Sequence, residues 1–257
     1  MKHTTIFHKK KLKLKKPILI EGLPGIGLVG KLAADHLIKE LKAEKVAELY
    51  SPSFPHQVIM QKKGTLRMLK NRFYAWRNPK KNGNDLLILV GDVQAVTSEA
   101  QYEICGAMLD FFHHQGGSFI YTLGGYGMGT VLEKPRVLGS ATHKELIPKH
   151  EKYGVVFGQS QGSIIGAAGL LLGLGKLRKM QGVCLMGETH GGYVDAKSAQ
   201  AMLEVLCKAL DIKVNLDKIV SRAKESEEFM KKMEQETQKQ EKLAESLGKD
   251  SGLSYIR

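Results

Sequence analysis

The sequence has few cysteines: three among 257 residues, with no two at CxxC spacing. An odd number without that spacing argues against both a disulfide framework and a zinc site. We therefore expect a cytoplasmic chain that holds no metal. Cys105 stands at helical spacing with Met108, Leu109 and Phe112. This pattern is typical of a small core residue and not of a catalytic thiol.

Long apolar runs are also missing. The longest, residues 163–175, is rich in glycine and falls well short of the roughly 20 residues that a membrane helix needs. The first 16 residues carry seven lysines and no acid, but they lack the apolar region and the cleavage site of a signal peptide. We expect no membrane span and no membrane partner. Residues 1–16 are interpreted as a basic N-terminal segment, either flexible or at a sheet edge.

Acidic residues are absent from a second segment, residues 62–81, which forms a basic patch. Its cations are Lys62, Lys63, Arg67, Lys70, Arg72, Arg77, Lys80 and Lys81. Without these eight and the first seven, 24 of the 39 basic residues remain against 26 acidic ones, so the net charge of +13 is localised. Phe73, Tyr74 and Trp76 interleave with the patch, as in surfaces that bind single-stranded nucleic acid. The same alternation fits a half-buried strand whose charged face meets water or an acidic protein, and we favour the strand.

Hydrophobic periodicity predicts strands and helices along most of the chain. Apolar runs predict strands at 17–21, 46–50, 57–61, 65–69, 72–76, 85–90, 118–123, 136–140, 155–157 and 183–186. Helical spacing predicts helices at 28–41, 98–114, about 164–172 and 196–210, and glycines indicate a loop at 124–129. Residues 46–76 have the pattern of antiparallel strands. The rest of the core has the pattern of βαβ units. The core, residues 17–214, is thus predicted to be an α/β domain with a layered mixed sheet flanked by helices.

The character of the sequence changes from Leu216 onward. Apolar or small residues recur there every three or four positions in a weak heptad. Residues 217–250 carry eight basic and nine acidic side chains, with no glycine or proline before Gly248. This predicts a long, charged helical arm over residues 215–247. A C-terminal tail, residues 248–257, follows the arm.

A glycine-rich turn, GLPGIGLVGK, stands between the first predicted strand and the first predicted helix. Three of its glycines fit GxGxxG, which would bring backbone amides and a helix N-terminus to a pyrophosphate. However, Glu48 lies inside the next strand and not at its end, and Leu32 replaces the Ser or Thr of a P-loop. The Gly25–Lys31 loop therefore indicates either a nucleotide- or nucleoside-binding enzyme or close packing of a helix on its strand.

Two further patterns are typical of catalytic sites but are incomplete. GQSQG fits the GxSxG nucleophile elbow through Ser160, yet the only later histidine, His190, precedes Asp195, so the order Ser, acid, His is not met. Glu188 and His190 end a strand at the edge where α/β proteins bind ligands. No further metal ligand stands at suitable spacing, and we favour a hydrogen-bonding role for this corner. We expect a chain that is not an enzyme.

Five glycine-rich or apolar segments occur in one order over roughly residues 17–212. They are PILIEGLPGIGLVGKLAADHL, DLLILVGDVQAVTSEAQYEICGAMLDFF, TLGGYGMG, GSIIGAAGLLLGLG and CLMGETHGGYVDAKSAQAMLEVL. Together they resemble the proteasome assembly chaperone family in its archaeal form. The resemblance implies a fold similar to that of the purine nucleoside phosphorylases without their active-site chemistry. It also implies a homo-oligomer, a role in proteasome assembly, and no cofactor.

The resemblance draws attention to the C-terminus, because proteasome-binding proteins often end in a hydrophobic residue, a tyrosine and one further residue. Those residues insert between adjacent α subunits. Here Tyr255 stands one place too early and Ser254 precedes it. We still expect an exposed anchor, because an apolar, aromatic tip binds at low ordering cost. The anchor residues are Leu253, Tyr255, Ile256 and Arg257.

The predicted function is a non-enzymatic proteasome assembly chaperone or adaptor. It would bind proteasome α subunits or the core particle as a homo-oligomer, through its C-terminal tails. The basic patch, Lys62–Lys81, could face an acidic protein surface. The alternatives are a nucleotide- or nucleoside-binding enzyme that uses the Gly25–Lys31 loop and a nucleic-acid binder that uses the basic patch.

Overall fold

The most apolar runs of the sequence form the centre of one nine-stranded sheet. We describe a computed structural model of the chain over residues 1–8, 12–62, 64–159, 162–219 and 221. In it β2 (Ile18–Gly22) lies between β7 (Leu86–Gly91) and β8 (Phe119–Gly127) and is parallel to both. All residues of β7 are buried. Strands covered on both faces are continuous apolar runs in sequence, which is why these strands are predicted well.

Six further strands complete the sheet on either side of this centre. They are β1 (Thr5–His8), β3 (Glu44–Tyr50), β6 (Asn71–Trp76), β9 (Val137–Ala141), β10 (Val155–Phe157) and β11 (Gln181–Thr189). The order across the sheet is β1, β3, β6, β7, β2, β8, β11, β9, β10. β6 is antiparallel to β3 and β7, while β11 is parallel to β8 and antiparallel to β9. The predicted mixed sheet and its antiparallel part are confirmed.

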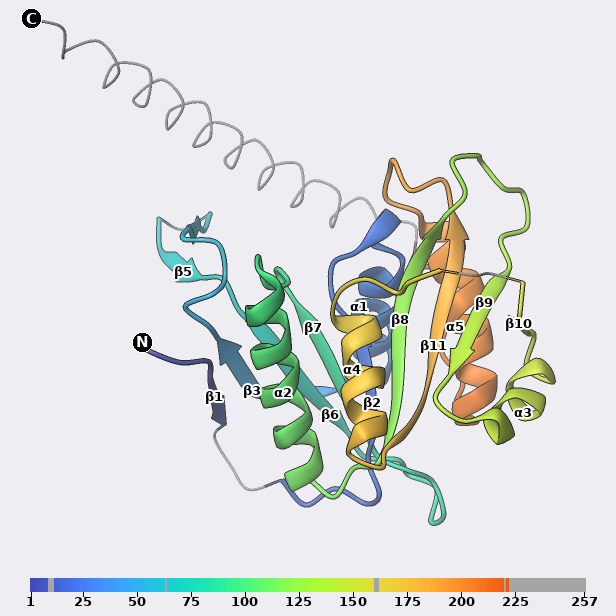
Figure 1. The fold of residues 1–257 in the computed structure, drawn as a ribbon, viewed down its shortest axis with the longest axis horizontal. Helices are drawn as coiled ribbons and strands as arrows, with labels where there is room; N and C mark the ends of the chain where they lie inside the picture. Colours follow the sequence, from blue (N-terminus) through green and yellow to red (C-terminus); the bar gives the residue numbers. More distant parts are fainter. Residues whose placement is uncertain (9–11, 63, 160–161, 220, 222–257) are drawn as a thin grey trace, which may run out of the picture.

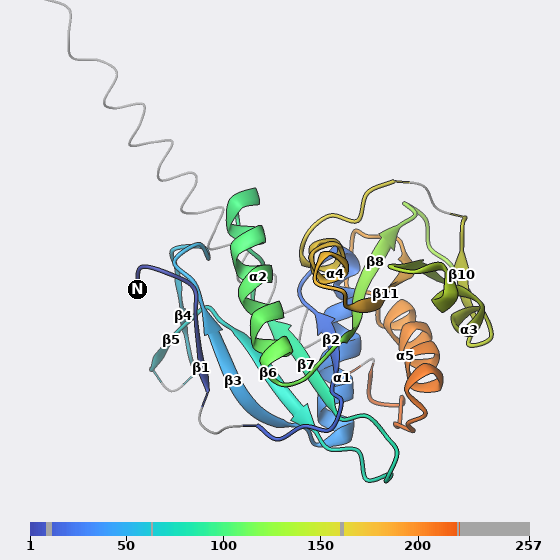
Figure 2. The same cartoon turned by 60° about the horizontal axis from the view of Figure 1, so that its bottom comes forward.

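Helices cover both faces of the sheet (Figures 1 and 2). α1 (Val29–Leu41) and α5 (Ala196–Leu210) pack together on one face, and α2 (Ser98–His114) and α4 (Ala167–Leu177) on the other. Each face buries its own apolar core. The layered α/β fold class is confirmed, while the likeness to the purine nucleoside phosphorylases stays a prediction. The remaining helical turns are η1 (Ile26–Leu28), η2 (Lys144–Leu146) and α3 (Ile147–Glu151).

α2 and α5 begin where the sequence predicts because each has a side-chain cap. The Oγ1 of Thr97 accepts a hydrogen bond from the backbone N of Ala100 at 3.3 Å. The carboxylate of Asp195 accepts one from the backbone N of Ser198 at 3.0 Å. Such caps satisfy a backbone N–H that has no partner inside the helix. Both helices also end at their predicted residues.

Other parts of the chain differ from the prediction. Residues 124–127 continue β8 and are not a loop, because they pair in register with residues 186–189 of β11. α4 begins three residues later than the predicted 164 and continues to Leu177. β1 lies at the edge of the sheet, which agrees with the edge interpretation of residues 1–16. The sequence did not indicate the short helices η2 and α3.

A separate two-stranded sheet lies between β3 and β6 in the sequence. It consists of β4 (Val58–Met60) and β5 (Leu66–Met68), which pair antiparallel. Since β3 is parallel to the central strands, the segment after it lies at their carboxyl end. The β4–β5 hairpin stands at that end of the molecule (Figure 1).

The start of the predicted arm packs on the core. Ile219 is buried in the layer of α1 and α5, and the Nε2 of His36 lies 2.5 Å from the carbonyl oxygen of Asn215. Residues 222–257, with most of the arm and the candidate anchor, lie outside the described residues, so the division into arm and tail stays a prediction. Among the helices described, none is long and apolar enough to cross a membrane.

Candidate functional site at the carboxyl end of the sheet

The Gly25–Lys31 loop packs closely against the chain's own backbone. A Cβ on Gly22 would lie 2.4 Å from the carbonyl oxygen of Gly30, and a Cβ on Gly30 would lie 2.1 Å from that of Leu123. Gly27 has a φ of +62°, a conformation that favours glycine. These glycines allow α1 to lie directly on β2 and β8. Close packing, one of the two interpretations drawn from the sequence, therefore explains them.

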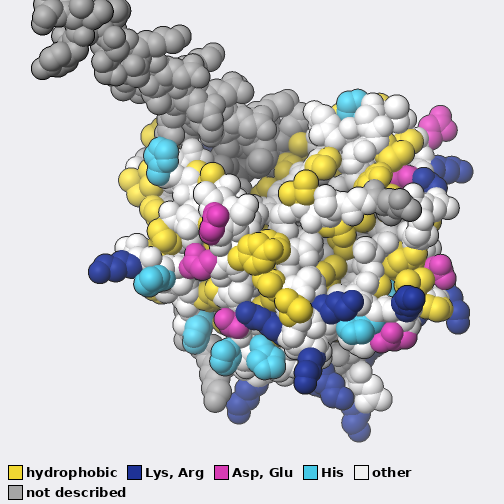
Figure 3. Space-filling model, in the orientation of Figure 1, with side chains coloured by type: hydrophobic (Ala, Val, Ile, Leu, Met, Phe, Trp, Pro, Cys, Tyr) yellow, Lys and Arg dark blue, Asp and Glu magenta, His cyan; other side chains and the backbone are white. Residues whose placement is uncertain are grey.

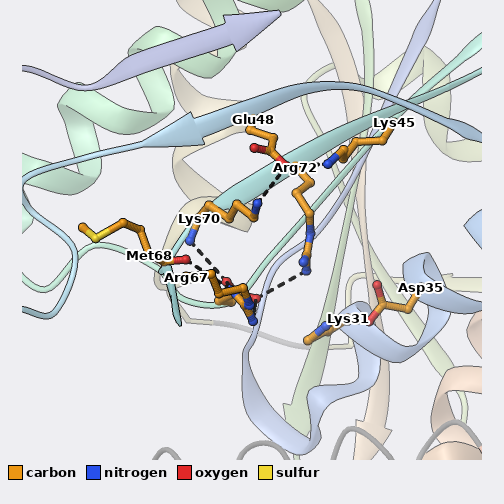
Figure 4. Close-up of polar contacts among 9 residues, drawn as sticks. Lys31, Asp35, Lys45, Glu48, Arg67, Met68, Lys70 and Arg72 are labelled. Atoms are coloured by element: carbon orange, nitrogen blue, oxygen red, sulfur yellow. Dashed lines mark hydrogen bonds and ion pairs between the residues drawn. The ribbon is translucent and has the colours of Figure 1, made fainter. Parts of the chain in front are cut away.

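Lys31 stands where a P-loop carries its phosphate-binding lysine, but it is paired within α1. Its Nζ lies 2.5 Å from the Oδ2 of Asp35, one helical turn further on (Figure 4). Only 8% of the Lys31 side chain is exposed. A phosphate-binding lysine directs its ammonium group at the ligand. Here a carboxylate of the same helix compensates that charge, which weighs against the nucleotide-binding alternative.

β2 carries a buried acid near its carboxyl end. Glu21 is 1% exposed, and its Oε1 accepts a hydrogen bond from the backbone N of Leu23 at 2.9 Å. Its Oε2 has no hydrogen-bond partner among the described residues. Burial raises the pKa of Glu21 from 4.5 to about 7, although hydrogen bonds from the backbone of Leu23 and Leu123 act to lower it. The fold thus favours the neutral form of this carboxyl group.

The corner at the end of β11 holds Glu188 and His190 by hydrogen bonds. Glu188 is buried, and its Oε1 accepts from the Nη2 of Arg136 at 2.5 Å. These hydrogen bonds lower the pKa of Glu188. The Nδ1 of His190 accepts from the backbone N of Gly192 at 3.2 Å, and the imidazole stacks on Tyr193. The predicted hydrogen-bonding role of this corner is confirmed.

The remaining candidates for chemistry give no site in the described ranges. No group of three or more His, Cys, Asp or Glu side chains there could hold a metal ion. Cys105 is fully buried, and burial, with a smaller effect of Glu21, raises the pKa of its thiol to about 12. Its predicted place in the core is confirmed. Cys184 is buried too, and burial raises its pKa to about 12. Ser160 lies outside the described residues.

Four cations of the basic patch form ion pairs within the described part of the chain. Their partners are carboxylates of β3, of the segment after β7 and of the residue that follows α5. Figure 4 shows the part of this network around β3, β5 and β6. The pairs are Arg67–Asp92, Arg72–Asp92 at 3.3 Å, Lys70–Glu48 at 2.8 Å and Lys80–Asp211 at 2.6 Å. The patch therefore offers an acidic partner less charge than its sequence indicates.

The aromatic residues of the patch belong to β6 and pack inward. Phe73 is fully buried, while Tyr74 and Trp76 are half-buried against the layer of α1 and α5, on the other face of the sheet. The three rings do not form an exposed platform on which bases could stack. The strand interpretation is confirmed, and the nucleic-acid alternative loses its stacking surface.

One surface feature was missed by the sequence-based interpretation. The β4–β5 hairpin exposes apolar side chains on one face, which we name the hairpin face. It consists of Val58, Met60, Leu66 and Met68, with 41%, 82%, 67% and 54% of each residue exposed. Alternation along 58–60 and 66–68 was visible in the sequence, but alternation alone does not tell which face meets the core.

Comparison with known proteins places this fold in a family. The profile of the PAC2 family matches residues 19–234. The chain belongs to the PAC2 family. A relative from Methanocaldococcus jannaschii, described as an uncharacterised protein, is 40% identical over 233 residues, which cover 91% of this chain and 89% of that protein.

Two solved structures are similar to this PAC2-family chain over most of its length. Pyrococcus furiosus PbaB, described as an archaeal proteasome activator, is 46% identical, with a TM-score of 0.83 over 91% of this chain and all of PbaB. P. furiosus PbaA, described as an archaeal homolog of proteasome-assembly chaperone, is 26% identical, with a TM-score of 0.74 over 93% of this chain and 99% of PbaA. The resemblance to the archaeal proteasome assembly chaperones is confirmed.

We predict that Gly30→Ala destabilises the fold, because its methyl carbon would lie 2.1 Å from the carbonyl oxygen of Leu123. Overpacking of this kind costs about 1–3 kcal/mol. Urea denaturation should show this loss in the free energy of unfolding. Gly173→Ala is the matched control, since its Cβ would meet no atom within 4 Å, and it should raise stability by about 0.5–1 kcal/mol. If Gly30→Ala were as stable as the unmodified chain, the packing role would be wrong.

We predict that Glu21 makes the fold less stable as pH rises from 4.5 to 7. Below pH 4.5 the carboxyl is neutral in both states, and above its folded pKa of about 7 the ionised form is buried at full cost. The difference amounts to about 3 kcal/mol. Glu21→Gln cannot ionise, so its free energy of unfolding should lack this fall when both proteins are titrated in urea. Parallel pH profiles for the two proteins would show that Glu21 titrates normally.

Proposed function

We propose that this chain is a non-enzymatic, cytoplasmic proteasome assembly chaperone or adaptor. The observation that carries the proposal is its likeness to PbaB, described as an archaeal proteasome activator, at 46% identity and a TM-score of 0.83. The likeness covers 91% of this chain and all of PbaB. Fold alone would not support a function, so the proposal rests on the 46% identity together with the shared fold.

The geometry of the candidate catalytic patterns supports a role in binding rather than catalysis. The glycine turn serves helix packing, Lys31 is paired with Asp35, and Glu188 is held by Arg136. An active site needs groups directed at a substrate, with their pKa values tuned for it. In the described ranges these groups instead form contacts, hydrogen bonds and ion pairs within the chain. Their partners stabilise the loops at the carboxyl end of the sheet and fix the shape of that surface.

The proposed contact with the proteasome is the C-terminal anchor. Tyr255 can insert its ring between adjacent α subunits, with Leu253 and Ile256 on either side of it. Arg257 ends the chain one place later than the usual pattern, so the anchor would dock in a shifted register. One short tail binds modestly, but a homo-oligomer presents several, and each further tail binds at high effective concentration.

The test is binding of the full chain to isolated α subunits and to assembled core particle, measured by surface plasmon resonance. We expect loss of binding when residues 252–257 are deleted. Tyr255→Ala should weaken binding by about thirtyfold, as for a buried aromatic anchor, whereas the control Ser254→Ala should change it little. If the deletion variant bound as tightly as the full chain, the tail would not be the contact with the proteasome. If the intact chain bound neither species, the proteasome role itself would be wrong.

A further inference from the structure

A cavity of about 740 Å³ lies at the amino end of the sheet. It is lined by the first residues of the three central strands, Ile18 of β2, Leu86 of β7 and Phe119 of β8. The segment before β2, the β6–β7 connection (residues 77–85) and the end of α5 complete its lining. Sites for small molecules measure about 300–1,000 Å³. The cavity therefore has the size of such a site, at the opposite end of the sheet from the Gly25–Lys31 loop.

The cavity is surrounded by positive charge. Lys16, Lys80, Lys149 and Lys208 line it, and Asp211 is the only acid among its lining residues. The Oδ2 of Asp211 lies 2.6 Å from the Nζ of Lys80, whereas the other three lysines form no ion pair with a described residue. Figure 3 shows Lys and Arg side chains along the lower edge of the molecule, where the amino ends of the central strands lie. Like charges around one cavity repel, and an anion between them would remove that cost.

The carboxyl end of the sheet is arranged differently. There the Nζ of Lys31 lies 2.5 Å from a carboxylate oxygen of Asp35, and Arg136 is paired with the buried carboxylate of Glu188. Each of these cations has its own carboxylate within the chain. The cavity has one carboxylate for four lysines. It therefore favours an anionic ligand from outside the chain.

One side of the cavity is aromatic. Phe119, Tyr121 and Tyr153 line it, and the ring centroids of Phe119 and Tyr121 are 5.1 Å apart. The Nδ1 of His150 donates to the carbonyl oxygen of Leu146 at 2.6 Å, so its Nε2 accepts from the hydroxyl of Tyr121 at 2.8 Å. Tyr153 packs edge-on against the same imidazole. A flat ring of a ligand would thus meet aromatic side chains whose positions are already fixed.

The β6–β7 connection adds amide groups to the lining, from Asn78, Asn82 and Asn84. The Nδ2 of Asn84 donates to the carbonyl oxygen of Lys16 at 2.7 Å. The backbone N of Asn78 donates to the Oδ1 of Asp85 at 2.9 Å. These bonds hold the connection against the segment before β2 and the start of β7. A side-chain amide both donates and accepts, which suits the polar edge of a nucleobase or a ribose hydroxyl.

We propose that this cavity binds a nucleoside phosphate. The base would pack against the aromatic side, near Phe119 and Tyr153, and the phosphates would lie among the lysines. Ammonium groups bind phosphate oxygens as point charges and need no fixed geometry, so lysines of three separate segments can converge on one ligand. The site takes up the ligand without a reaction, and it is separate from the Gly25–Lys31 loop.

An acidic peptide would also match the positive charge. Peptides are bound in extended grooves or along sheet edges, however, and a cavity of this size takes one small molecule. Charge alone would also leave the aromatic side without a role. A ligand that carries both a flat ring and several negative charges uses both features. This inference goes beyond the proposed function and does not depend on it.

The test is isothermal titration calorimetry of the full chain with ATP in the absence of magnesium. ATP should bind with a dissociation constant below about 1 mM. Adenosine lacks the phosphates and tripolyphosphate lacks the ring, so each should bind at least about tenfold more weakly than ATP. Added salt should weaken the binding of ATP, because it screens the lysines.

Lys149→Gln and Lys208→Gln should each weaken ATP binding about fivefold, because each removes one charge from the cavity. Tyr153→Leu should weaken the binding of ATP but leave that of tripolyphosphate unchanged. Lys197→Gln is the matched control, since Lys197 is also exposed and belongs to α5, but lies in its first turn, at the other end from Lys208. It should bind ATP as tightly as the unmodified chain.

Several results would overturn the inference. They are no binding of ATP, binding of adenosine or tripolyphosphate as tight as that of ATP, or an equal loss of affinity in Lys197→Gln. Displacement of ATP by a polyglutamate peptide at equal concentration would identify the ligand as an acidic protein segment instead. Thermal unfolding of each variant without ligand shows that the fold is retained. None of these measurements involves the proteasome, so either proposal can fail while the other holds.

Discussion

The contact between the backbone of α1 and the central strands determines the rest of the fold. Gly22 and Gly30 remove the side chains that would separate helix from strand, so the first turn of α1 lies against both β2 and β8. With α1 fixed there, α5 packs beside it, and β2 stays between its two parallel neighbours. The glycines that resemble a dinucleotide loop are thus explained by the close packing of α1 on the sheet. Dinucleotide loops also use a glycine for close helix–strand contact, which explains why the two look alike.

The fold class could be predicted from the sequence because hydrophobic periodicity and helix caps are local features of the chain. The boundaries of α2 and α5 follow from Thr97 and Asp195, whose capping side chains precede a run of helical spacing. Residues 124–127 were misjudged because three of them are glycines, and glycine indicates a loop when its strand partner is unknown. Their partner, β11, lies about 60 residues away in the sequence. Pairing at that separation leaves no local signature.

The site was partly predictable for the same reason. The pair Lys31–Asp35 follows from i, i+4 spacing on a helix, and the incomplete triad around Ser160 could be rejected from chain order. The pair Arg136–Glu188 joins the residue before β9 to a residue of β11, about 50 positions apart in the sequence, and could not be foreseen. The hairpin face could not be predicted from the sequence for another reason. Both strands alternate, and the side that faces the core is set by the ion pair between Arg67 and Asp92 and by the packing of Ile59.

The buried thiols have a consequence for work on this protein in solution. The thiolate is the reactive form of cysteine. With a pKa of about 12, Cys105 and Cys184 hold on the order of one thiolate in 10⁵ molecules at neutral pH, and for Cys207, whose pKa burial raises to about 11, the fraction is on the order of one in 10⁴. Maleimides and other thiol reagents should therefore spare all three native cysteines. A single cysteine introduced on the surface would react selectively, so fluorophores and spin labels can be attached without first removing the natural thiols.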